Sequence, residues 1–144
     1  MPIRSDVSPD PARLTGGALD AVTIIVVTRE SAHCLPALNT LLSHCPNVIV
    51  SDNGSADGTA ASARRLWQHA IVLDHGRNLG FGAANNRALA RVQTPFAFLL
   101  NPDCEIDGPG LEALLATAAA MPQAAVLAPQ LVSASGKPEI NYRF

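Results

Sequence analysis

The chain has 144 residues and a mass of 15.0 kDa, which fits one domain. Hydrophobic residues make up 48% of the sequence and charged residues only 15%, so we expect a globular core and exclude a chain that is disordered throughout. Ten basic and twelve acidic residues give a net charge of −2, and the basic footprint of a nucleic-acid-binding protein is therefore absent.

The first twenty residues contain three prolines and no apolar segment of the kind that a secretory signal needs. We predict that residues 1–20 form a mobile leader and that residues 21–144 form the domain. The longest apolar stretch, residues 111–129, is interrupted by Glu112 and Pro122, so no transmembrane segment is predicted.

The three cysteines are Cys34, Cys45 and Cys104, and their odd number and wide spacing favour a reducing, cytoplasmic compartment over a disulfide framework. The pairs His33-Cys34 and His44-Cys45 repeat at an interval of eleven residues, which raises the question of a zinc site. On one helix the two pairs would lie about 16 Å apart, too far to share an ion that holds its ligands within about 2.3 Å. We therefore expect packing and helix-end roles for these residues.

Apolar runs alternate with helical stretches along the rest of the chain. A continuous β-branched run at residues 22–27 is typical of a strand buried on both faces. Further strands are predicted at residues 48–50, 71–73, 96–100 and 124–128, and helices at residues 35–45, from 57 or 59 to 68, at 82–92 and at 110–121. This alternation predicts an α/β fold with a doubly wound, mostly parallel sheet and right-handed crossovers.

Polar, turn-forming residues follow four of the predicted strands. In sheets of this class, ligands bind outside the carboxyl ends of the strands, so we expect the functional site there. The segments concerned are Thr28-Arg29-Glu30, Asp52-Asn53-Gly54, Arg77-Asn78 and Asn101-Pro102-Asp103.

Two of these segments have both a structural and a functional interpretation. The loop that begins at Asp52 is typical of a tight turn with a helix cap, but its carboxylate is also suited to accept a ring N–H of a nucleobase. The loop with Gly80 and Gly82 is explained by backbone that requires positive φ, but a helix that begins with two glycines also offers its N–H groups to a phosphate. The residues alone leave both alternatives open.

Asp103 also has two interpretations. The segment with Pro102 suits a turn that ends a strand, and an Asp103 carboxylate at the rim of the sheet suits Mg²⁺ or Mn²⁺ held together with substrate phosphates. A nicotinamide fingerprint is disfavoured, because Gly80 and Gly82 follow the third predicted strand and not the first. A GxSxG nucleophile motif is absent, so acyl transfer has no support.

Read together, five segments resemble, in order, the nucleotide-binding half of an inverting family 2 glycosyltransferase with the GT-A fold, a Rossmann-like architecture. The resemblance covers residues 22–144, and the NPD and GFGAANN segments look most like the rhamnosyltransferase-like branch. The five segments are VTIIVVTRES, VIVSDNGSADGT, NLGFGAANNRAL, FAFLLNPDCEI and APQLVSASGKPEINYRF.

The resemblance implies roles for individual residues. Thr28 would line the base pocket, Asp52 would bond the base, and Asp103 would bind a divalent Mn²⁺ or Mg²⁺ ion that bridges the pyrophosphate. Asn101 stands where many members have a first acid, and Arg29 stands where an aromatic residue is usual. The further positions expected near the nucleotide are Arg29, Asn53, Arg77, Asn78, Gly82 and Asn101.

The implied reaction is transfer of a sugar such as rhamnose, with inversion, from a dTDP- or UDP-sugar to a glycan or lipid-linked acceptor at the inner face of the membrane. The catalytic base of the family lies in the acceptor half, which we expect to be missing from this chain, and Glu139, the last acid present, does not match the base motif. We therefore expect a partial transferase that self-associates or is poorly stable alone. A non-catalytic nucleotide-binding module is the main alternative, and a nicotinamide-dependent oxidoreductase is the weaker one.

Overall fold

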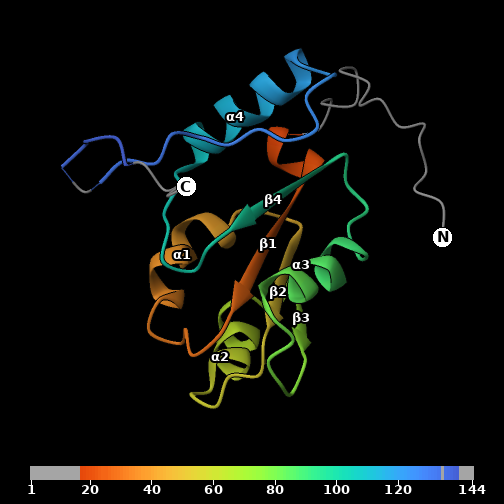
Figure 1. The fold of residues 1–144 in the computed structure, drawn as a ribbon, viewed down its shortest axis with the longest axis vertical. Helices are drawn as coiled ribbons and strands as arrows, with labels where there is room; N and C mark the ends of the chain where they lie inside the picture. The colour runs from red at the N-terminus through yellow and green to blue at the C-terminus, as the bar shows by residue number, and fades with distance from the viewer. Residues whose placement is uncertain (1–16, 134, 140–144) are drawn as a thin grey trace.

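The computed structural model describes residues 17–133 and 135–139, which form one parallel sheet with helices on both faces (Figure 1). The strand order is β3-β2-β1-β4, and every pairing is parallel. The doubly wound α/β fold is thus confirmed. Its elements are the 3-10 helix η2 (Ala18–Ala21), the strands β1 (Val22–Thr28), β2 (Val48–Asp52), β3 (Ile71–Asp74) and β4 (Phe96–Leu100), and the helices α1 (Leu35–Leu42), α2 (Thr59–Leu66), α3 (Phe81–Leu89) and α4 (Gly108–Ala120).

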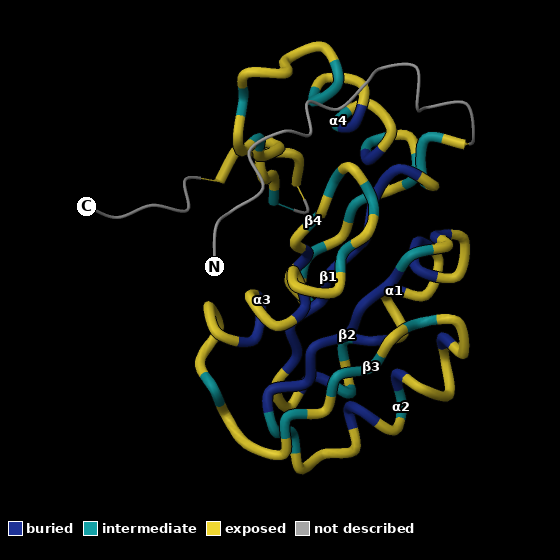
Figure 2. Tube along the Cα trace, turned by 90° about the vertical axis from the view of Figure 1, so that its right-hand side faces the viewer, coloured by how far each residue is buried: buried dark blue, intermediate teal, exposed yellow. Residues whose placement is uncertain are grey.

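The centre of the sheet is formed by β1 and β2, in which every residue is buried. Figure 2 shows this buried core as the dark blue part of the trace. A strand that is covered on both faces has no solvent side, so its sequence does not alternate with polar residues, and Val22–Thr28 is a continuous β-branched run. The sequence prediction of a doubly covered first strand is therefore confirmed.

Two apolar clusters cover the two faces of the sheet. On one face, Leu38 of α1, Trp67 at the end of α2 and Leu111 of α4 pack against Ile24 and Val50. The opposite face is covered by α3. The smaller cluster on this face contains Ala84 and Ala88 of α3, packed against Ile25, Val27 and Ile49 of the strands. The short alanines let α3 approach the sheet closely, which places its first turn near the carboxyl ends of β1 and β2.

Helices were predicted in the right order, with ends displaced by a few residues. The chain leaves α1 after Leu42 because His44 and Cys45 donate to the carbonyls three residues earlier, which tightens the last turn. The same tightening ends α3 at Leu89. Residues 18–20, which the sequence analysis placed in the leader, belong to η2, and Ala18 and Leu19 pack against the core. Residues 1–16 of the predicted leader lie outside the described residues.

The strand predicted at residues 124–128 is wrong. This segment pairs with no strand in the described chain, and Val126 is 85% exposed. An apolar run becomes a strand only when a neighbouring strand accepts its hydrogen bonds and a second layer buries its side chains. Neither condition is local, and the run Ala124–Ala128 satisfies neither here.

The sheet is covered unevenly at β4. Leu100 is buried, but Leu99, which points to the face covered elsewhere by α3, is 48% exposed. In the described chain β4 pairs only with β1, so its outer edge has no strand neighbour. None of the described helices combines the length and the apolar character that a membrane crossing requires.

Candidate functional site

The strand order places a ligand-binding position between β1 and β4. Strands β1, β2 and β3 are added in one direction, and β4 then lies on the other side of β1. In open parallel sheets, the crevice at such a reversal, outside the carboxyl ends of the strands, is where nucleotides bind. Thr28 and Asp52 lie at this end, directly opposite each other in the register of β1 and β2.

Asp52 is the centre of a hydrogen-bond group at these strand ends. Its carboxylate is 1% exposed, and one oxygen, Oδ1, accepts from the Thr28 hydroxyl at 2.9 Å and from the Ser55 hydroxyl at 2.6 Å. The other oxygen, Oδ2, accepts from the backbone N–H of Ser55 at 3.0 Å. An ionised carboxylate has about four acceptor positions, so this group leaves one on Oδ2.

Asn53 connects the loop after β2 to the glycine-rich loop after β3. Its side-chain nitrogen donates to Asn78 Oδ1 at 2.8 Å, and its Oδ1 accepts from the backbone N–H of Leu79 at 2.7 Å. The Asn53 backbone N–H also donates to the Thr28 carbonyl at 2.8 Å. Through its side chain and its backbone, the buried Asn53 therefore holds three chain segments together.

Gly54 allows the same two loops to touch at backbone level. Its φ is +76°, and a Cβ atom at this position would lie 2.6 Å from the backbone of Arg77. Only glycine satisfies both the left-handed conformation and the close approach. The position of Arg77 is therefore determined through its backbone, while its side chain is exposed.

The loop after β1 is fastened to the loop after β2. The backbone N–H of Glu30 donates to the Ser55 hydroxyl at 2.9 Å, and Glu30 Oε1 accepts from the N–H of Ala56 at 2.8 Å. Asp57 Oδ2 accepts from the N–H of Ala32 at 3.0 Å. These bonds hold Glu30 in a left-handed conformation with φ +49° and leave the neighbouring Arg29 exposed at the rim.

A further connection, which the sequence analysis did not single out, joins β2 to the start of α3. The Ser51 hydroxyl donates to the Ala84 carbonyl at 3.0 Å and lies 2.9 Å from His75 Nε2. Because the hydroxyl hydrogen is used on Ala84, His75 must donate through Nε2, and its Nδ1 faces Arg87 at 3.5 Å. The signal in the sequence was a serine at the end of an otherwise apolar strand.

The residues after β4 are arranged differently. Asn101 and Asp103 are exposed, and the Asn101 carbonyl accepts from the N–H of Cys104 at 3.1 Å, which makes the turn around Pro102. Burial, and then the charge of Asp103, raise the pKa of the Cys104 thiol, so this sulfur stays protonated beside the carboxylate at neutral pH.

A divalent cation at this turn would need phosphate oxygens of a bound substrate, in addition to the protein side chains, to complete its coordination. No three His, Cys, Asp or Glu side chains gather into a metal site within the described residues. Mg²⁺ and related hard cations are commonly held by one or two protein carboxylates together with substrate phosphates and water. The exposed Asp103 carboxylate and the Asn101 amide oxygen are donors of this type, whereas the protonated Cys104 thiol is not.

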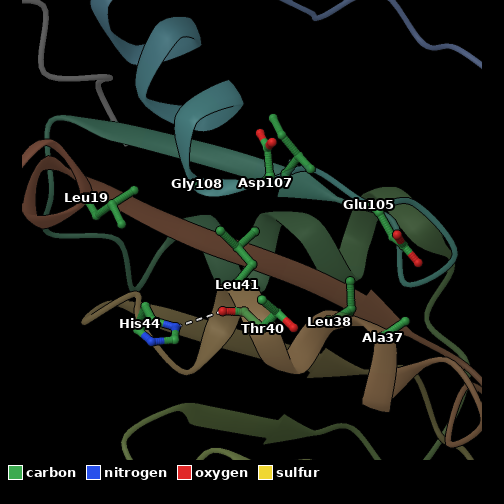
Figure 3. A pocket seen from close by; sticks show the side chains of 10 residues that line it. Leu19, Ala37, Leu38, Thr40, Leu41, His44, Glu105, Asp107 and Gly108 are labelled. Atoms are coloured by element: carbon green, nitrogen blue, oxygen red, sulfur yellow. Dashed lines mark hydrogen bonds between the residues drawn. The ribbon is translucent and has the colours of Figure 1, made fainter. Parts of the chain in front are cut away.

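A mainly apolar cavity lies elsewhere in the structure (Figure 3). It has a volume of about 600 Å³ and lies between α1 and residues 105–108, beside η2. Leu38 and Leu41 give it a mainly apolar wall, and the His44 ring, which contacts the Thr40 carbonyl at 2.8 Å, marks one end. It does not include Thr28, Asp52 or Asp103, so we separate it from the candidate site.

The structure brings together some of the predicted site residues. Thr28, Asp52, Asn53 and Asn78 are joined by hydrogen bonds, and Arg77 is held by the Gly54 contact. Gly82 lies in the first turn of α3 with open space around it. Arg29, Asn101 and Asp103 lie on loops at the same end of the sheet, and no hydrogen bond among the described residues joins their side chains to this group.

Comparisons with known proteins identify the family to which the chain is similar. The family model described as glycosyl transferase family 2 matches residues 23–143. The chain is 29% identical over 133 residues to an N-acetylglucosaminyl-diphospho-decaprenol L-rhamnosyltransferase of Mycobacterium tuberculosis, found in strains CDC 1551 / Oshkosh and ATCC 25618 / H37Rv. The alignment covers 81% of this chain and 43% of the relative, so the chain spans less than half the length of the curated relatives it matches.

Proposed function

Because this chain belongs to glycosyltransferase family 2, we propose that it forms the nucleotide-sugar-binding part of an inverting, metal-dependent glycosyltransferase. The proposed donor is a dTDP- or UDP-sugar, such as a rhamnose donor, and the proposed acceptor is a glycan or a lipid-linked sugar. The observation that carries the proposal is the hydrogen-bonded group of Thr28, Asp52, Asn53 and Asn78 at the carboxyl ends of β1, β2 and β3, on one side of the point where the strand order reverses.

In this proposal Asp52 recognises the nucleobase. The remaining acceptor position on Asp52 Oδ2 suits a ring N–H of thymine or uracil, and the three bonds from Thr28 and Ser55 hold the carboxylate in place. Since the protein itself supplies these bonds, binding would order few additional groups. Arg29, Arg77 and the N–H groups near Gly82 lie around this position and are proposed to contact the base, ribose or phosphates.

Asp103 is proposed to hold the divalent metal, with Asn101 as a neutral neighbour. A bound Mn²⁺ or Mg²⁺ ion would act as a Lewis acid on the diphosphate that leaves the anomeric carbon. The attacking acceptor hydroxyl needs a general base, and we assign no residue of this chain to that role. The acceptor half, self-association through the open edge of β4 and a cytoplasmic position at the inner face of the membrane are parts of the same proposal.

Calorimetry with UDP, dTDP, GDP and NAD, each with and without Mn²⁺, tests the proposal. We expect dTDP or UDP to bind, and Mn²⁺ to increase the affinity. Asp103→Asn should remove most of the increase, and Asp107→Asn, which changes a carboxylate four residues away at the start of α4, should retain it. Asp52→Asn should weaken nucleotides but not inorganic pyrophosphate. Equal affinity for all four ligands, with no effect of the metal, would contradict the proposal.

A second candidate is a nucleotide-binding module without catalysis. It is favoured by the hydrogen bonds that join the loops around Asp52 and Asn53, because such a group supports binding of a nucleotide without itself supplying a catalytic base. A donor-consumption assay with an acceptor separates the two functions. Binding without turnover supports the module, and transfer by this chain alone would make Glu105 and Glu139 the first residues to replace in a search for the base.

A further inference from the structure

Charged side chains divide the described chain into two unlike parts. Residues 59–92, which include α2, β3 and α3, contain five arginines and one acidic residue, Asp74, a net charge of +4 when histidine is neutral. Residues 101–139 contain five acidic residues and one cation, Lys137, a net charge of −4. The strand order places β3 at one edge of the sheet and β4 at the other, so the two charged parts lie toward opposite ends of the molecule (Figure 1).

The cations of the first part approach the edge strand β3 from both faces of the sheet. On the face covered by α2, Arg64 reaches Asp74 at the end of β3, with 3.9 Å between Nη2 and Oδ2. On the face covered by α3, Arg87 Nη1 lies 3.5 Å from Nδ1 of His75, the residue directly after β3. These two contacts place a guanidinium group on each side of the same sheet edge.

We define the β3-edge surface as five exposed residues: Arg64 and Arg65 of α2, Ile71 of β3, Arg87 of α3, and Arg91 about one turn after Arg87. The ion pair of Arg64 is the only one that the described residues form, and its two side chains are 51% and 44% exposed, so it neutralises little of the charge. The outer edge of β3 has no strand neighbour within the described chain, and Ile71 is 46% exposed there.

We propose that the β3-edge surface binds the anionic face of a lipid bilayer. This inference rests on the membrane position within the proposed function and supplies a surface for it. Arginines that come from helices on opposite faces of the sheet are spread across its edge, which suits an extended layer of lipid phosphates better than one small anion. Ile71 adds an apolar side chain among these charges.

This orientation is compatible with access to the candidate site. A surface at the edge of a sheet runs along the strands, because neighbouring strands are stacked at right angles to their own direction. The carboxyl ends of the strands, where Thr28 and Asp52 lie, would then open along the plane of the bilayer and not into it.

Flotation of the whole chain with lipid vesicles, without nucleotide, tests the inference. One set of vesicles contains phosphatidylcholine alone, and the other contains in addition about 30 mol% of the anionic lipid phosphatidylglycerol. We expect the chain to float with the anionic vesicles and not with the neutral ones. NaCl at about 0.5 M should remove most of the binding, because salt screens exposed charges.

Substitutions at the two arginines of the α3 side test the surface itself. Near an anionic bilayer, each exposed arginine contributes a factor of about five in affinity, so Arg87→Gln/Arg91→Gln should bind about 25-fold more weakly. Lys137→Gln is the matched control, because it removes an exposed cation from the opposite end of the sheet, and it should bind as the wild type does. Arg87→Lys/Arg91→Lys keeps both charges and should also retain binding, since a bilayer does not require the fork geometry of a guanidinium.

Several outcomes would overturn the inference. Equal binding to neutral vesicles, or equal losses for Lys137→Gln and Arg87→Gln/Arg91→Gln, would show that these arginines do not bind lipid phosphates. Displacement by millimolar inorganic phosphate, or loss of binding in the lysine variant, would indicate a discrete phosphate site instead of a bilayer surface. Light scattering that shows assembly of the chain at low salt, lost in the glutamine variant while vesicle binding is unchanged, would assign the surface to a second copy.

The vesicle result and the nucleotide result are separate measurements. If the chain binds dTDP or UDP but no anionic vesicles, the proposed nucleotide site stands and this inference alone is wrong. If it binds anionic vesicles through the arginines but no nucleotide, the proposed function is wrong and the membrane surface stands.

Discussion

The two ends of the described chain differ in how their loops are held. At the ends of β1, β2 and β3, side-chain hydrogen bonds join residues 24 to 28 positions apart, as in the bonds of Asp52, Asn53 and Thr59. After β4, side-chain hydrogen bonds within residues 101–139 reach at most nine positions along the sequence. We refer to these parts as the donor edge, residues 28–32, 51–59 and 74–81, and the post-β4 segment, residues 101–139.

The comparison shows which part of the site the chain can organise by itself. The donor edge holds Asp52 and Asn53 through hydrogen bonds between its own loops, so the nucleobase binding proposed above would order few additional groups. The post-β4 segment is anchored mainly by Leu111 and Leu115 of α4, and the exposed Asp103 accepts a hydrogen bond from the thiol of its neighbour Cys104. The metal–diphosphate contact proposed at Asp103 would therefore depend on the ligand for most of its organisation.

The largest effect is expected at the contact of Gly54 with Arg77. Gly54→Ala adds a Cβ atom 2.6 Å from backbone at a φ of +76°, so strain and overlap should together lower the free energy of unfolding by about 3 kcal/mol. The matched variant is Gly136→Ala in the post-β4 segment. Gly136 also has a φ of +76° but has open space around it, so alanine there should cost about 1 kcal/mol or less.

Urea unfolding of the two glycine variants measures this difference. Similar losses of unfolding free energy for Gly54→Ala and Gly136→Ala would mean that the donor edge relaxes around the added Cβ atom. The proposed difference between the two regions would then be wrong.

A smaller effect is expected from removing one hydroxyl at the donor edge. Thr28→Val keeps the shape of a fully buried side chain but takes one donor from the Asp52 carboxylate, and bonds to a buried charge contribute about 2 kcal/mol each. The same change at Thr117, an exposed residue of α4 that bonds within its own helix, should cost less than about 0.5 kcal/mol. Chemical denaturation measures both, and equal costs would show that Ser55 alone holds Asp52.

The strands that the sequence predicted correctly are those whose signal is local. Residues 22–27 and 48–50 are recognisable because burial on both faces selects continuous β-branched runs. Residues 124–128 have the same apolar character, yet form no strand, because pairing depends on a partner that the sequence pattern does not reveal. The helix ends at Leu42 and Leu89 were missed for a related reason, since a tightened last turn has no strong sequence signature.

Sequence reasoning predicted only part of the arrangement of the candidate site residues. Thr28, Asp52, Asn53 and Asn78 were expected at one edge because carboxyl ends of parallel strands meet there, and their hydrogen bonds now connect them. The partners that fix them were not foreseen. Ser55 and His75 are ordinary turn residues in the sequence, and only the crossing of loops shows that one holds Asp52 and the other meets Ser51.

The smallest expected effect concerns stability at acidic pH and the hydrogen bonds of the Asp57 carboxylate. Hydrogen bonds from the Thr59 side chain and then from the Ala32 N–H lower the pKa of Asp57 below the usual range of aspartate. The contribution of a group with a lowered pKa is present at neutral pH and is lost as the pH falls through the folded-state pKa. Asp57 is exposed, so we expect a modest effect, seen as a melting temperature a few degrees lower for Asp57→Asn at pH 7.

The difference in melting temperature between wild type and Asp57→Asn should narrow as the pH is lowered through the acid range. Protonation of Asp57 in the wild type removes the negative charge that the substitution has already removed. Thermal unfolding at a series of pH values from 7 to about 2 follows this convergence, which rests on the linkage between pKa and stability. Asp57 joins the loop after β1 to the start of α2, whereas Asp107, the carboxylate at the start of α4, bonds only to the N–H of Gly110 within its own turn. A gap that stays constant across this pH range would mean that Asp57 contributes through the shape of its turn and not through its charge, and that the donor edge is held together by its neutral groups.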